Sequence, residues 1–361
     1  MTDNEPDESA PFGTQTEIEV PERTGLSWRW WARAVVGAAL AVGLLAWGLP
    51  KVTGASWQAT SQALTYVGLG QGLVMFALLL VAMWCYTFVL SASLPGLTHR
   101  KAWIVNVSGS SVSNLVPFGG AAGVGVTYMM CRSWGFSRTA IALSTAMSGL
   151  WNVMAKLAMP AIGLAALVLG GGLVAHRLAV AAGVGACLLV VVILVVITVL
   201  VSERAALVVG RAAARAGEVV LWVMRSHRRL HWDDAIVQTR RRTTALVRRS
   251  WVGMTFGMAG FLAVYAVLFL TCLYSVGAHP TLPQALAAYT LGRLLTSVVI
   301  TPGGLGIAEA GSGALLVALG VPAAPAAAGV LLFAFYVHIL EVPLGALGWL
   351  GWTLMRRSVP V

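Results

Sequence analysis

Several long, mainly apolar stretches in this sequence are candidates to cross a lipid bilayer. They occupy residues 34–49, 72–92, 178–201, 252–276 and 323–354. The hydrocarbon core of a bilayer is about 30 Å thick and a helix advances about 1.5 Å per residue, so one span needs roughly 20 apolar residues. Only 10% of the 361 residues are charged, against about 25% in soluble domains. The chain is therefore predicted to be an all-α, polytopic integral membrane protein.

The basic residues lie between these stretches and indicate the orientation of the chain. The segment 202–250 holds eleven Arg and four acidic residues, and Lys and Arg concentrate in cytoplasmic loops. We predict that it is a cytoplasmic amphipathic segment that lies along the membrane; the alternative is a solvated loop that only sets the topology. The acidic residues 1–26, expected to be disordered, and the tail 356–361 are also assigned to the cytoplasm, with the spans in the plasma membrane.

Two stretches, near 105–130 and 291–319, break the apolar pattern with Pro and Gly. The first contains NLVPFGG from Asn114, and the second contains ITPGGLG from Ile300. Pro removes a backbone donor, and each Gly lowers helix stability by about 1 kcal/mol. At membrane depth, broken backbone survives only where protein or a wet cavity satisfies its polar groups. We therefore predict two re-entrant, broken helical hairpins beside about six full spans, of which the sixth is 139–172.

The two breaks lie 185 residues apart, counted from the Pro of the first to the Pro of the second. The alignment at this offset pairs glycines, Gly119 with Gly304 and Gly135 with Gly320. Three full spans separate the hairpins, and an odd number of crossings reverses their orientation. The halves 27–201 and 251–355 thus have the pattern of an inverted-topology repeat, in which interrupted helices meet near the midplane and form a binding site.

Four ionisable residues inside apolar segments are the first candidates for function. They are Lys156, Arg293, Glu309 and Glu341, with His338 close to the last. A charge at the centre of a membrane helix costs about 2.5 to 3.5 kcal/mol on insertion scales, so each should face protein or water and have a partner. We expect Glu309 to pair with Arg293, and Lys156 with Glu341. The sequence leaves open whether such pairs lock the structure or contact a substrate.

Polar residues and the exposed amides of the two breaks complete the candidate substrate-binding site. Asn114 and Asn152 are expected to line a polar path, although polar residues in membrane helices also serve packing. The backbone amides of Gly-rich breaks suit a phosphate oxygen, as helix N-termini do. The residues of the breaks assigned to the site are Pro117, Gly119, Gly120, Pro302, Gly303, Gly304 and Gly306.

Motifs of soluble enzyme chemistry are missing from the sequence. There is no GxSxG, GxxxxGK[ST] or HExxH pattern, and the four Cys have neither CxxC nor Cys/His spacing. We predict no catalytic residue, no metal site and no cofactor. The formal charge of +11 lies mainly between the spans and is assigned to topology, not to nucleic acid.

At its two Gly-rich segments the chain resembles the transmembrane-domain family of lysylphosphatidylglycerol synthases, whose membrane part is regarded as a lipid flippase. The resemblance covers roughly residues 33–355 and rests on NLVPFGGAAGVGV (114–126) and ITPGGLGIAEAG (300–311). Shorter matches are Gly135-Phe136-Ser137 and Leu319-Gly320-Val321-Pro322. Full-length synthases carry a soluble aminoacyl-transfer domain after the membrane part, whereas this chain stops at Val361. No synthase activity is therefore expected.

The leading hypothesis for function is a flippase that moves an anionic phospholipid or a lipid-linked headgroup between leaflets, through a cavity lined by the two hairpins. One alternative is a membrane subunit of a lipid-modifying or glycolipid-synthesising enzyme system. Another is a non-transporting scaffold. The expected partners are the lipid and either a second copy of the chain or a separate lipid-modifying enzyme, and no nucleic acid.

Overall fold

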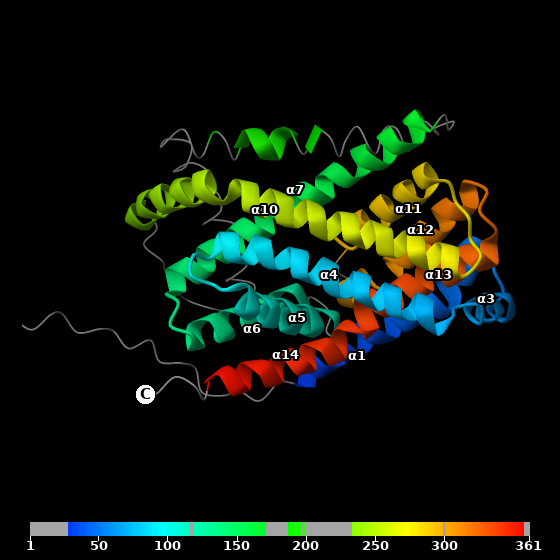
Figure 1. Ribbon diagram of the computed structural model, residues 1–361, viewed down its shortest axis with the longest axis horizontal. Coiled ribbons are helices and arrows are strands. Elements are labelled where there is room, and N and C mark those ends of the chain that lie inside the picture. The colour runs from blue at the N-terminus through cyan, green and yellow to red at the C-terminus, as the bar shows by residue number, and fades with distance from the viewer. Residues whose placement is uncertain are drawn as a thin grey trace, which may run out of the picture.

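The computed structural model of the chain describes residues 28–115, 119–170, 187–188, 190–195, 198, 233–298 and 301–356. These residues form helices and no strand (Figure 1), which confirms the predicted all-α class. The elements of the first half are α1 (Trp28–Gly43), η1 (Leu44–Gly48), α2 (Leu49–Thr53), α3 (Trp57–Leu64), α4 (Leu69–Ser93), α5 (His99–Leu115), α6 (Gly119–Ser133) and α7 (Arg138–Leu169). Those of the second half are α10 (Asp233–Ser275), α11 (Leu282–Leu295), η2 (Pro302–Gly304), α12 (Ile307–Ala318), α13 (Ala323–Ala334), η3 (Phe335–Ile339) and α14 (Glu341–Arg356).

Helices long and apolar enough to cross a membrane occur at five of the six predicted positions. They are Val35–Thr53, Leu69–Ser93, Arg138–Leu169, Arg249–Ser275 and Ala323–Met355. The remaining predicted span, 178–201, lies largely outside the described residues, as do 1–26 and most of 202–250. α10 begins at Asp233, within the predicted Arg-rich segment, and continues into its span without interruption.

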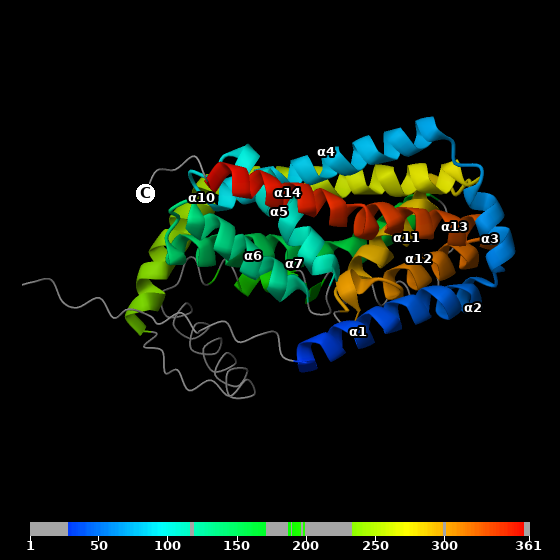
Figure 2. The same ribbon diagram turned by 90° about the horizontal axis from the view of Figure 1, so that it is seen from below.

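Both predicted breaks are occupied by helical hairpins. In hairpin 1, α5 packs along α6, and in hairpin 2, α11 packs along α12. α5 ends at Leu115 and α6 begins at Gly119, and the residues between them lie outside the described ones. Between α11 and α12, η2 is a short 3-10 turn. Figure 2 shows the two hairpins toward opposite ends of the bundle. That the two hairpins are re-entrant stays a prediction.

The same helix stop recurs in both halves at the 185-residue offset. Gly135 follows α6 with φ +87°, and Gly320 follows α12 with φ +92°, a backbone region that favours glycine. In both turns the residue after the glycine donates its amide to the carbonyl oxygen five residues before it, at 3.2 Å and 3.0 Å. This is the Schellman pattern of helix termination. The two glycines therefore end equivalent helices, as the inverted repeat predicts.

The two halves also exchange helices in a reciprocal way. α14, which follows hairpin 2, packs along α5 of hairpin 1, and α7, which follows hairpin 1, packs along α11 of hairpin 2. α4 and α10, which precede the hairpins, pack along each other. Reciprocal packing of this kind is what a pseudo-two-fold repeat produces.

Small residues let the exchanged helices approach closely. A Cβ added at Gly345 of α14 would overlap the side chain of Ser111 in α5. A Cβ added at Gly163 of α7 would overlap Thr290 in α11. Lipid tails are as apolar as the helices, so close packing of this kind, and not hydrophobic exclusion, holds membrane helices together.

The largest buried cluster lies along the contact of α4 with α10 and extends to α13. Met75 and Leu79 of α4 and Leu268 and Leu273 of α10 are completely buried in it. This cluster fixes α10 beside α4, and the next turns of both helices toward the centre of the bundle line the cavity described below.

Candidate functional site

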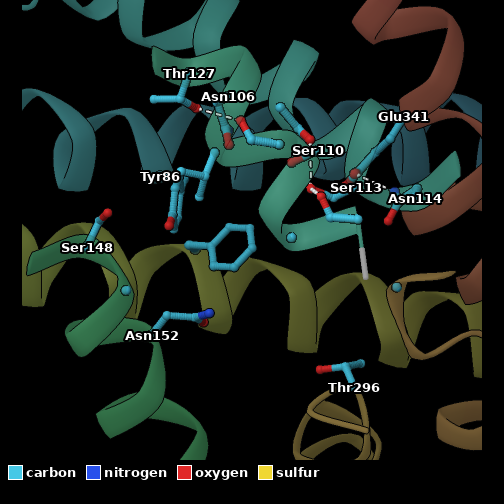
Figure 3. Close-up of a pocket in the computed structure, with 18 of the residues that line it drawn as sticks. Tyr86, Asn106, Ser110, Ser113, Asn114, Thr127, Ser148, Asn152, Thr296 and Glu341 are labelled. Carbon is cyan, nitrogen blue, oxygen red and sulfur yellow. Dashed lines mark hydrogen bonds between the residues drawn. The ribbon is translucent and has the colours of Figure 1, made fainter. Parts of the chain in front are cut away.

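A cavity of about 610 Å³ lies where the ends of the two hairpins meet. Here α5 and α6 contact η2, so the break of hairpin 2 faces the break of hairpin 1. Figure 3 shows Asn152 of α7 and Thr296 after α11 across the cavity from Ser110 and Ser113 of α5. Sites that hold drug-sized molecules have volumes of about 300 to 1,000 Å³. The cavity is therefore large enough for a lipid headgroup.

Most of the residues predicted for the site line this cavity. They are Asn114, Gly119, Gly120, Asn152, Lys156, Arg293, Gly303, Gly304 and Glu341. Glu309 lines a smaller cavity beside it, which Arg293 also reaches. Pro302 and Gly306 belong to the break of hairpin 2 but line neither cavity, and Pro117 lies outside the described residues. Their assignment to substrate binding stays a prediction.

Arg293 of α11 is held by aromatic rings and not by a carboxylate. Its guanidinium carbon lies 5.7 Å from the ring centre of Phe261 and 5.5 Å from that of Tyr265, both in α10. Within the described residues it makes no ion pair, so the predicted pair with Glu309 is absent. Cation–π contacts orient a guanidinium while leaving its hydrogen-bond donors available.

Glu309 instead closes the N-terminus of its own helix. Its carboxylate accepts a hydrogen bond from the backbone amide of Gly306, the residue that precedes α12. Its other oxygen lies 3.8 Å from Nε2 of His338. Only 5% of Glu309 is exposed. A carboxylate that caps a helix N-terminus satisfies an amide that would otherwise be unpaired, which gives Glu309 a structural role.

Glu341 is bound by two neutral donors. The hydroxyl of Tyr265 donates to one carboxylate oxygen at 2.7 Å, and the amide of Asn114 donates to the other at 2.9 Å. Lys156 makes no ion pair among the described residues, so the predicted pair of Lys156 with Glu341 is absent as well. Both residues nevertheless line the same cavity.

A chain of polar contacts joins the two hairpins through the helix that follows the second. The side-chain oxygen Oδ1 of Asn114 lies 3.3 Å from Nδ1 of His338, and the other ring nitrogen of His338 faces Glu309. His338 lies in η3, a π-helical turn between α13 and α14, and such turns are frequent at functional sites. Asn114 lies near the end of α5 in hairpin 1 and Glu309 belongs to hairpin 2, so this chain of contacts fixes one hairpin against the other.

Some polar atoms at the cavity have no partner within the part of the chain that the structure describes. They are Nε of Arg293 and the hydroxyl of Thr301, a residue that is 1% exposed. An unsatisfied buried polar group costs about 1 to 3 kcal/mol. These donors are therefore expected to bind water or a ligand.

Exposed small and apolar residues form a rim on one side of the cavity. The rim consists of Gly120 and Val124 of α6 and of Gly149 and Val153 of α7. Val124 is 45% exposed and Val153 is 49% exposed, although both also line the cavity. Polar and charged side chains reach into the cavity among apolar ones, whereas this rim has no polar side chain.

Residues that the sequence analysis did not select also shape the site. Phe261 and Tyr265 lie in a strongly apolar span, where aromatic residues are typical of the core, and nothing in the sequence distinguishes them. Thr301 directly precedes Pro302, and this position beside the break is the signal that could have identified it. In the described residues no cluster of His, Cys, Asp and Glu fits a metal ion.

The comparison with known families agrees with this architecture. The family described as "Lysylphosphatidylglycerol synthase TM region" matches residues 34–345. This match covers most of the chain, so the protein belongs to that family, which connects it with membrane lipids. No curated protein matches the chain.

Proposed function

We propose that this member of the lysylphosphatidylglycerol synthase transmembrane-region family moves the headgroup of an anionic phospholipid or a lipid-linked molecule between leaflets, through the cavity at the hairpin ends. The observation that carries the proposal is that Lys156 and Arg293 line this cavity without an ion pair to any described carboxylate. Unpaired cations at membrane depth are costly and mark the pathway of a substrate.

The setting of Arg293 supports a phosphate as the group that it binds. The rings of Phe261 and Tyr265 hold the guanidinium plane, and a guanidinium held in this way can donate two parallel hydrogen bonds to a phosphate. The unpaired hydroxyl of Thr301 adds a neutral donor at the same cavity.

The apolar rim supports a lipid as the molecule that carries this phosphate. A headgroup inside the cavity would leave its acyl chains beside Val124 and Val153, in contact with apolar side chains. A water-soluble anion needs no such opening. The rim thus favours entry from the bilayer, with the headgroup beside the polar and charged side chains of the cavity and the tails outside.

The proposal includes a topology in which the two hairpins enter the bilayer from opposite faces and both termini are cytoplasmic. The concentration of Arg in 202–250 supports this orientation, and the placement of the hairpins at opposite ends of the bundle is consistent with it. A reporter fused after Arg240 should be active only in the cytoplasm. Activity outside the cell would contradict the orientation.

Translocation is best tested with the purified full chain in phospholipid vesicles. The probe is phosphatidylglycerol with a fluorescent label on its acyl chain, and a quencher added outside the vesicles removes the signal of lipid in the outer leaflet. The remaining fluorescence should decay at a rate that depends on the protein. Arg293→Ala and Lys156→Ala should each slow this rate about tenfold or more, because a hydrogen bond to a charged group contributes about 1.5 to 3 kcal/mol. Lys51→Ala is the matched control, because Lys51 lies over the ring of Trp47 and not in the cavity.

Three outcomes would overturn the proposal. Wild-type rates for both cavity variants, in protein that elutes as the wild type does, would remove the assigned site. Loss of a lipid product from a deletion strain, with no change in leaflet distribution, would instead favour an enzyme subunit. A null phenotype fully rescued by Arg293→Ala would favour the scaffold.

A further inference from the structure

The two sides of the cavity differ in chemistry. α7 and α11 pack together and contribute both cations, Lys156 and Arg293. α5 and α6 contribute hydroxyl and amide groups and no charged group, as Figure 3 shows for Ser110, Ser113 and Thr127. A ligand that fills the cavity therefore meets positive charge on one side and neutral hydrogen-bonding groups on the other.

The cavity is lined by two cations and one carboxylate among the described residues. Glu341 is the one acidic residue among the described residues that line it, and both of its oxygens already accept hydrogen bonds from Tyr265 and Asn114. Glu309 in the neighbouring cavity is engaged by the amide of Gly306 and faces His338. An ammonium group entering the cavity would meet two cations, and the one carboxylate that lines it is already hydrogen-bonded to two neutral donors.

Hydrogen-bonding groups without a partner lie on more than one side of the cavity. The hydroxyl of Ser110 on α5 and the amide of Asn152 on α7 line it and make no hydrogen bond within the described residues, and the buried hydroxyl of Thr301, beside the break of hairpin 2, is also unpaired. A site built to bind hydroxyl groups discriminates strongly against a ligand that lacks them, because its polar groups then stay unpaired.

We propose that this cavity selects lipid headgroups that combine a phosphate with free hydroxyl groups and that lack an amino group. The phosphate binds between Lys156 and Arg293, and the hydroxyl groups face Ser110 and its neighbours on α5 and α6. The aminoacylated lipid that gives the family its name is then a poor substrate for this chain. The inference rests on the proposed function and specifies its substrate class.

The test compares lipids that differ only in headgroup, using the wild-type chain in vesicles and acyl-labelled probes. Phosphatidylglycerol and phosphatidylinositol should both move about tenfold faster than lysyl-phosphatidylglycerol, a ratio that corresponds to about 1.4 kcal/mol. Phosphatidylethanol, which has the charge of phosphatidylglycerol but no hydroxyl group, should also be slower than phosphatidylglycerol. These comparisons need no variant, so a folding defect cannot explain them.

Variants then test which residue discriminates against the amino group and which one recognises the hydroxyl groups. Lys156→Gln should bring the rate for lysyl-phosphatidylglycerol closer to that for phosphatidylglycerol, because one repelling charge is removed, whereas Lys51→Gln should leave the ratio of rates as it is. Ser110→Ala should narrow the difference between phosphatidylglycerol and phosphatidylethanol.

The outcomes separate this inference from the proposed function. Equal rates for phosphatidylglycerol and its lysyl ester, or a faster ester, would overturn the headgroup selectivity and leave translocation standing. Equal rates for phosphatidylglycerol and phosphatidylethanol would overturn the requirement for hydroxyl groups. If no probe moved faster than in vesicles without protein, translocation itself would be refuted.

Discussion

Asn114, the penultimate residue of α5, donates a hydrogen bond of 2.9 Å to the buried carboxylate of Glu341, at the start of α14. The two residues are 227 positions apart in the chain. Their contact ties the end of hairpin 1 to the helix that follows hairpin 2, and Tyr265 of α10 bonds the same carboxylate. The cavity is thus bounded by a hydrogen-bonded joint between the two halves.

Loss of this joint should destabilise the whole protein. Asn114→Ala leaves one oxygen of Glu341 without its donor, which should lower the free energy of unfolding by about 1 to 3 kcal/mol. The midpoint of thermal unfolding in detergent, followed by tryptophan fluorescence, measures the change. Asn152→Ala is the matched control, because Asn152 lines the same cavity but makes no hydrogen bond within the described residues. Equal midpoints for the two variants would show that the joint contributes no stability.

A bulky side chain at the rim should slow translocation without disturbing the fold. A Cβ at Gly149 meets no atom within 4 Å, so Gly149→Trp has room on the protein side and narrows the opening between α6 and α7. The control is Gly125→Trp. Gly125 lies in α6, its Cβ position is equally open, and it does not line the cavity. We expect a rate reduced about tenfold for the first and a wild-type rate for the second, where tenfold corresponds to about 1.4 kcal/mol. If the two variants transported lipid equally fast, the headgroup would have to enter elsewhere.

The two substitutions at Glu309 should separate a capping role from a role in binding. Gln can accept the same amide hydrogen bond at this position of a capping box, so Glu309→Gln should unfold close to the wild-type midpoint. Glu309→Ala removes the acceptor and should cost about 0.5 to 2 kcal/mol. Because Glu309 lies outside the main cavity, Glu309→Gln should also translocate lipid at the wild-type rate. A rate as low as that of Arg293→Ala would instead place Glu309 in contact with the substrate.

The contact of α14 with α5 should not tolerate a methyl group at its closest point. Gly345→Ala would push a Cβ into Ser111, and overpacking of this kind costs about 1 to 3 kcal/mol. Gly351→Ala, two turns further along α14, would meet Ile104 at 3.4 Å or more and should be close to neutral. Unfolding midpoints of the two variants give the comparison. If Gly345→Ala unfolded at the wild-type midpoint, α14 and α5 could move apart without loss of stability.

The spans and hairpins were predictable from the sequence because they depend on local properties. Span length follows from bilayer thickness, and the breaks follow from Pro and Gly, whose effect on a helix needs no knowledge of distant residues. The helix stops at Gly135 and Gly320 are local in the same sense. Each could be identified from the sequence around it.

The partners of the intramembrane charges were not predictable, for two different physical reasons. Lys156 and Glu341 are equivalent in the repeat, but residues related by a pseudo-two-fold axis touch only when both lie near that axis. Glu309 and Arg293 belong to one hairpin, but the Glu309 carboxylate binds the amide of Gly306, three residues before it in the chain. Tyr265, which does bind Glu341, has the sequence context of an ordinary core residue.

The reciprocal packing of the two halves has a consequence for biosynthesis. α5 is synthesised early, yet its partner α14 is the last helix of the described residues. α7 likewise leaves the ribosome long before α11. While the second half is still being translated, the inserted first half presents the polar face of α5 to the lipid without the helix that finally covers it. We therefore expect the nascent first half to depend on the insertion machinery or a chaperone until α14 arrives, and chains truncated before Glu341 to be degraded.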